Sequence, residues 1–167
     1  MNFDEIKQKI DELKKKGDVD LSLDEDLSIA IMNLISLEEH FFFTAEKTKK
    51  DDYFDLLKEV RDMRRELLGK MIDRHEGETW CISKHLLATA MRLMEVGTKL
   101  EASGKRDEAK KIFDLSYKTY SMFWGIRLKL IDVSEVKAKP REEVEGVWSF
   151  EDIVEKLVDC CDEGQKK

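Results

Sequence analysis

The chain has 167 residues, of which 40% are charged, and it contains one proline and eight glycines. This composition is typical of a helix-rich globular domain, and no apolar run approaches the ~20 residues that a membrane-spanning helix needs. The formal net charge of −7 argues against a general electrostatic affinity for nucleic acid. Composition and charge therefore predict one cytoplasmic domain without a membrane or nucleic-acid partner.

Apolar residues at helical spacing predict five helices separated by short polar connections. They cover residues 3–16, 23–47, 53–73, 80–102 and 107–131. The stretch from Ser22 to Glu25 has the form of a capping box and predicts the start of the second helix. Each amphipathic helix must cover its apolar stripe with another. The fold class is therefore expected to be all-α, with the four long helices in an antiparallel bundle. The short N-terminal helix is expected to belong to the same domain, which covers residues 1–131.

The chain beyond residue 131 predicts a linker and one more helix. Residues 132–148 are charged and hold the proline, and Ser149 is a candidate N-cap for a helix that reaches residue 162. Apolar residues at helical spacing form one stripe on this helix: Phe150, Ile153, Val154, Leu157 and Val158. We expect this amphipathic helix to pack on the bundle or on a partner.

A carboxylate is expected inside the bundle. The inward stripe predicted for residues 23–47 consists of Ile31, Leu34, Glu38, Phe41 and Ala45. The stripe predicted for residues 53–73 consists of Leu56, Val60, Met63 and Leu67. A buried carboxylate costs several kcal/mol unless it is paired or bound to a metal. The helix phase leaves open whether Glu38 or its neighbour Glu39 is the inward residue.

Two chemistries could satisfy such a carboxylate. Reflecting the helices through their connections predicts two polar layers, one of Glu38, Glu59, Arg92 and Glu95, the other of Asn33, Glu66 and His85. The simpler interpretation is an ion-pair layer in which Arg92 neutralises Glu38 and Glu95, without a cofactor. The alternative is a metal-binding protein or metal-dependent enzyme. Its first-row transition metal would be held by Glu38, Glu59, Glu66, His85 and Glu95, although the Glu-x-x-His spacing of dimetal bundles is missing.

Cys81 and His85 stand four residues apart on the helix predicted over residues 80–102. Such a pair can touch, and an imidazole beside a thiol favours a nucleophilic thiolate, so both residues are candidates for a catalytic, thiol-dependent function. The same two residues, with His75, would supply only three of the four ligands of a zinc site. The alternative is that Cys81 is a small core residue and His85 a core histidine. The remaining cysteines, Cys160 and Cys161, lack the spacing of a disulfide framework.

Two resemblances add to this interpretation. About 34 residues within the helices predicted over residues 80–102 and 107–131 resemble a single tetratricopeptide hairpin at its large and small packing positions, which are Leu93, Val96, Gly97, Leu100, Gly104, Ala109, Phe113 and Ser116. Ser121 stands where that unit has its terminal proline. The stretches "LEEHFFFT", "WCISKHLL" and "MRLMEVGTKL" are similar to a family of uncharacterised small bacterial helical proteins. That resemblance implies a shared bundle and, since the family has no assigned activity, no site residues.

The expected function is that of a helical interaction module, with a protein as its partner, either a second copy or another chain. Three consecutive phenylalanines, Phe41 to Phe43, cannot all face one core stripe, and a second aromatic set runs from Tyr120 to Trp124. An aromatic patch that stays exposed would mark a dimer or partner surface. The sequence does not identify a small-molecule ligand.

Overall fold

The structure is a computed structural model that describes residues 2–17, 19–73 and 78–131. These residues form α1 (Phe3–Lys16), α2 (Leu21–Thr48), α3 (Asp52–Gly69), α4 (Thr79–Ala102) and α5 (Arg106–Arg127). No strand occurs within these ranges, which confirms the predicted all-α class. The predicted linker and C-terminal helix, residues 132–148 and 149–162, lie outside the described residues.

Local capping explains where the first two helices begin. Asn2 and Glu5 form a reciprocal capping box at α1, and Gly17 ends that helix in the left-handed region with φ 76°. The second helix starts at Leu21 because the side chain of Asp20 accepts hydrogen bonds from the backbone N–H groups of Ser22 and Leu23, both at 3.1 Å. The capping box expected at Ser22 is therefore wrong, since an earlier carboxylate already caps the helix.

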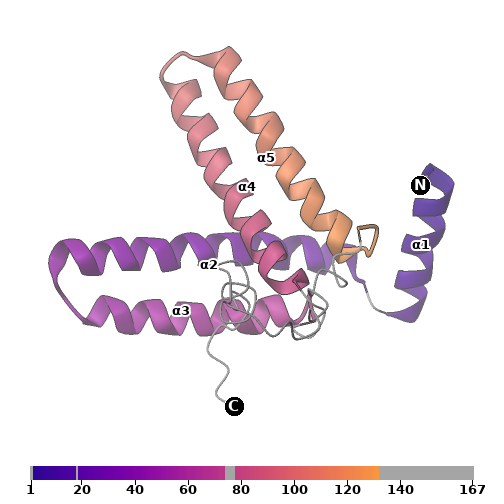
Figure 1. Cartoon of the computed structure of the whole chain (residues 1–167), viewed down its shortest axis with the longest axis horizontal. Coiled ribbons are helices and arrows are strands. Elements are labelled where there is room, and N and C mark those ends of the chain that lie inside the picture. The colour runs from indigo at the N-terminus through magenta and orange to yellow at the C-terminus, as the bar shows by residue number, and fades with distance from the viewer. Residues whose placement is uncertain (1, 18, 74–77, 132–167) are drawn as a thin grey trace, which may run out of the picture.

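The helices form two antiparallel hairpins that cross steeply, as Figure 1 shows. One hairpin consists of α2 and α3, the other of α4 and α5, and the link between them runs mainly through α2 and α4. The predicted bundle would align all four helices along one axis, whereas in Figure 1 the α4/α5 hairpin crosses the α2/α3 hairpin. Short connections make consecutive helices antiparallel, but the angle between the two hairpins depends on which side chains meet at their crossing.

The main hydrophobic core lies at this crossing. It contains side chains from both hairpins and from the turn after α3: Ile31, Met32, Leu68, Met71, Ile72, Trp80, Cys81, Leu87, Ala90 and Phe123. A smaller cluster of Leu13, Val19 and Leu128 packs the N-terminal segment against the end of α5. No helix among the described residues is long and apolar enough to cross a membrane.

The phase of α3 differs from the sequence prediction. Its buried residues are Val60, Arg64 and Leu68, whereas Leu56 and Met63 of the predicted stripe are exposed. One residue turns a helix by about 100°, so the shift from Met63 to Arg64 brings a guanidinium to the core and leaves a methionine outside. The rotation of α3 therefore determines both which charge enters the core and which apolar side chain stays at the surface.

Candidate functional site

The carboxylate expected in the core is paired with an arginine of the neighbouring helix. Arg64 of α3 donates from Nε to Oε1 of Glu38 at 2.8 Å and from Nη2 to Oε2 at 3.2 Å. The Arg64 side chain is 2% exposed and that of Glu38 is 15% exposed. Two parallel charge-assisted hydrogen bonds satisfy both charges where water is largely excluded. Of the two candidate acids, Glu38 is the inward one.

The expected partner Arg92 lies elsewhere. It is exposed on α4 and donates to Glu39, which is also exposed. The expectation that Arg92 neutralises Glu38 and Glu95 is therefore wrong. The reason is that α3 already brings Arg64 to the core side of Glu38, so α4 has no buried charge to neutralise there.

The other members of the predicted polar layers do not meet in the core. Asn33, Glu59, Glu66 and His85 are exposed, and Glu95 is half-buried. Glu66 lies 3.7 Å from the ammonium of Lys70, one turn along the same helix. Across residues 2–17, 19–73 and 78–131, no three His, Cys, Asp or Glu side chains come close enough together to hold a metal ion. The candidate ligands are thus spread over separate faces.

Cys81 and His85 occupy different environments although one turn of α4 separates them. Cys81 belongs to the main hydrophobic core, whereas His85 is exposed. A thiol that is buried among apolar side chains is closed to a substrate, and its neighbouring imidazole remains in solvent. Cys81 is therefore a core residue, as one of the two interpretations predicted, whereas His85 is not. His75 lies outside the described residues.

Sequence reasoning missed a second buried ion pair, which joins α2 to α5. Arg127 donates to Oδ2 of Asp24 from Nε at 2.9 Å and from Nη2 at 2.8 Å, and both side chains are almost fully buried. Burial raises the pKa of Asp24, and the charge and hydrogen bond of Arg127 oppose this shift only in part. The signal in the sequence was a pair of polar residues, Asp24 and Ser28, which share one face of α2 at a spacing of four residues, and that face contacts α5.

One turn further along α2, a hydroxyl pair repeats the same link. The Oγ of Ser28 lies 2.6 Å from the Oη of Tyr120 and 2.7 Å from the carbonyl oxygen of Glu25. Since the serine hydrogen points to that carbonyl, the tyrosine hydroxyl is the donor in the pair. The two links fix the position of α5 on α2 and hold the ring of Tyr120 in place.

An apolar hollow, here called the crossing hollow, lies between α2 and the α4/α5 hairpin. Its volume is about 390 Å³. Met32, Ala90 and Tyr120 form a largely buried floor, and Ile29, Met94 and Tyr117 form an exposed rim. Three helices thus contribute apolar side chains to one concave surface.

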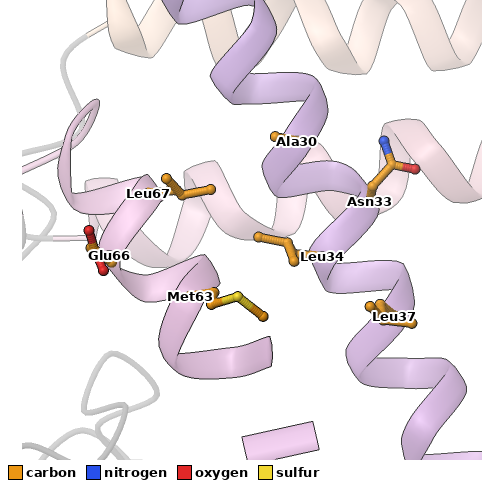
Figure 2. A pocket seen from close by; sticks show the side chains of 7 residues that line it. All are labelled: Ala30, Asn33, Leu34, Leu37, Met63, Glu66 and Leu67. Atoms are coloured by element: carbon orange, nitrogen blue, oxygen red, sulfur yellow. The ribbon is translucent and has the colours of Figure 1, made fainter. Parts of the chain in front are cut away.

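A second apolar hollow, here called the hairpin groove, lies between α2 and α3. Its volume is about 470 Å³. Figure 2 shows Leu34 and Leu67 pointing toward each other across the groove, with Met63 beside them and Asn33 and Glu66 at its edges. The groove exists because the phase of α3 leaves Met63 outside. The predicted stripes contained Leu34, Met63 and Leu67, but as core residues.

Comparison with known protein families, with curated proteins and with solved structures finds no match. The two resemblances noted in the sequence therefore stay predictions.

Proposed function

We propose that the protein is a helical interaction module that binds protein through the crossing hollow, and that a second copy of the chain is one of its partners. The observation that carries the proposal is the exposure of Tyr117. This side chain is 75% exposed at the rim of an apolar hollow. A large aromatic ring left in solvent beside other apolar side chains is the usual mark of an interaction surface.

The chemistry of the rim supports protein as the ligand. Ile29 and Met94 are also exposed there, and Phe113 lies on its edge. Aromatic residues and methionine are enriched at the centres of protein interfaces, because they offer much apolar area and, for methionine, an adaptable shape. Charged groups, which would suit an ionic small molecule, are missing from the residues that line this hollow.

The floor of the hollow favours a preformed site. Met32 and Ala90 are buried in the main core, and the hydrogen bond to Ser28 restrains Tyr120. A partner that inserts an apolar side chain would therefore meet a surface that is already in place, which lowers the entropy cost of binding.

Self-association of the full chain tests the proposal, with Tyr117→Asp as the variant and Leu115→Asp as its matched control. Leu115 is 50% exposed on the same helix, two residues and so about 200° away from Tyr117. Light scattering over a range of concentrations should show association of the natural chain and of Leu115→Asp. For Tyr117→Asp the dissociation constant should rise at least about tenfold, because a charge enters an apolar interface.

Helix content from circular dichroism shows whether each variant is folded. A natural chain that remains monomeric at every concentration would contradict the proposal, and so would an equal effect of the two substitutions.

A further inference from the structure

The hairpin groove is an apolar surface that the described part of the chain does not cover. Leu37 of α2 and Met63 of α3 border it and are 37% and 49% exposed. Leu34 and Leu67 line it from opposite sides, as Figure 2 shows. Paired helices normally bury such side chains, so a further element is expected over them.

This groove lies on the side of α2 that faces away from the other hairpin. Ser28 contacts Tyr120 of α5, and Ala30, which lines the groove, follows Ser28 by two residues. Two residues turn a helix by about 200°, so the groove and the α5 contact lie on nearly opposite sides of α2. The groove also shares no lining residue with the crossing hollow, which Ile29 and Met32 line on α2, so its occupant is independent of the proposed function.

The groove has the dimensions of a site for one short helix. From Ala30 to Leu37 it runs along two turns of α2, or roughly 10 Å at ~1.5 Å per residue. An amphipathic helix lies in such a groove with anchors at positions i, i+3, i+4 and i+7.

The C-terminal part of this chain carries those anchors. Phe150, Ile153, Val154 and Leu157 have this spacing, and Val158 extends the stripe. As a helix, residues 150–158 would present their stripe over about 12 Å, which matches the length of the groove. We propose that residues 149–162 dock as an amphipathic helix in the hairpin groove of the same chain.

The charges of this segment agree with that placement. Three of its five acids, Asp152, Glu155 and Asp159, fall about 130–175° around the helical period from the middle of the stripe, so in the docked helix they point to solvent and avoid Glu66 at the edge of the groove. The other two, Glu151 and Asp162, fall about 90–115° from the middle, at the side of the stripe. A second copy docked groove to groove would instead bring another Glu66 to the interface.

The segment is also tethered within reach. Arg127 at the end of α5 bonds to Asp24, which precedes Ala30 by six residues, or roughly 9 Å along α2. The 17 residues 132–148 can span up to about 56 Å when extended. A tether of this length gives the segment a local concentration in the millimolar range at the groove, so that modest affinity is enough for docking.

Disulfide trapping tests the proposal, because Cys160 and Cys161 already lie at the end of the stripe. The full chain carries Cys81→Ala to remove the core thiol, and Leu37→Cys to place a thiol at the groove. The matched control is Phe43→Cys, which is 49% exposed on the same helix but about 120° away from Leu37. Mild oxidation, electrophoresis without reductant and peptide mass mapping then identify which thiols are linked.

We expect a link within one chain from the Leu37→Cys thiol to Cys160 or Cys161, formed at least about tenfold faster than from the Phe43→Cys thiol. Adding Leu157→Asp should reduce the faster rate to that of the control, since it removes a central anchor but leaves the introduced thiol, Cys160 and Cys161 in place. Equal rates at the two positions would overturn the proposal, as would links formed chiefly between two chains, which indicate a second copy in the groove. The absence of any link would overturn it as well.

Discussion

Arg64 and Glu38 join α3 to α2 through two hydrogen bonds, with the Nε of Arg64 2.8 Å from Oε1 and its Nη2 3.2 Å from Oε2. Glu39, the next residue, pairs with Arg92 in solvent. Two adjacent glutamates therefore make ion pairs of very different burial. The free energy of a pair depends strongly on burial, because a charge that loses its partner in the interior cannot be compensated by water.

Removing the buried carboxylate should destabilise the fold far more than removing the exposed one. We expect Glu38→Ala to lower the free energy of unfolding by about 3 kcal/mol, because Arg64 loses an anionic partner within the core. Glu39→Ala should lower it by less than about 1 kcal/mol. Urea unfolding followed by circular dichroism measures both changes. Similar losses of unfolding free energy for the two variants would show that burial does not make the Glu38–Arg64 pair more important for stability than the exposed pair.

Gly97 should tolerate a methyl group only when its aromatic neighbour is removed. A Cβ at this position would lie 2.5 Å from Cε1 of Phe113, so the ring has to move. That strain costs about 1–3 kcal/mol, whereas replacing a mid-helix glycine with alanine contributes up to about 1 kcal/mol of helix stability. Gly97→Ala should therefore lower the free energy of unfolding by about 1 kcal/mol in the natural chain.

In a Phe113→Ala background the same Gly97→Ala substitution should raise the free energy of unfolding, because only the gain in helix propensity remains. Denaturant titrations of the four chains of this cycle give the coupling between the two positions. A coupling near zero would mean that α4 and α5 are further apart at Gly97 than the structure has them.

The Asp24–Arg127 pair makes stability depend on pH. Because burial raises the pKa of Asp24, the folded chain holds this carboxyl proton to a higher pH than the unfolded chain does. The stability that the protonated Asp24 side chain contributes is present in full below the ordinary aspartate pKa of about 3.9. It is lost as the pH rises through the raised pKa that Asp24 has in the folded chain. The stability of the natural chain relative to Asp24→Asn should therefore fall with rising pH over this acidic window.

Urea unfolding at a series of pH values measures this difference, with Asp26→Asn as an exposed control on the same helix. The control should show no such trend. A relative stability that rises with pH would mean that the attraction of Arg127 outweighs the burial of Asp24.

Cys81 should react with a thiol reagent only when the chain opens. In a chain with Cys160→Ser and Cys161→Ser, we expect the core position of Cys81 to slow labelling by Ellman's reagent at least about 100-fold relative to the urea-unfolded chain. The rate should rise with denaturant, in parallel with unfolding. Rapid labelling of the folded chain below pH 8 would instead support the thiol-dependent function that the spacing of Cys81 and His85 suggested.

Helical periodicity acts over a few neighbouring positions, so the amino-acid sequence alone was enough to predict the all-α class and the approximate extent of the five described helices. It also placed a glutamate on the inward face of α2, but it left open whether that residue is Glu38 or Glu39. It did not determine the phase of α3, since Met63 and Arg64 are adjacent and either could face α2. It did not determine the crossing of the hairpins either.

Which side chains meet became clear from the arrangement of the helices in space. The pairing of Glu38 with Arg64, of Asp24 with Arg127, and of Ser28 with Tyr120 joins residues far apart in the chain. Such contacts depend on how the helices are rotated and crossed, and a rotation of one residue exchanges a core side chain for an exposed one. The rotation of α3 that buries Arg64 leaves Met63 at the hairpin groove, so this rotation accounts for both the ion pair and the uncovered apolar surface.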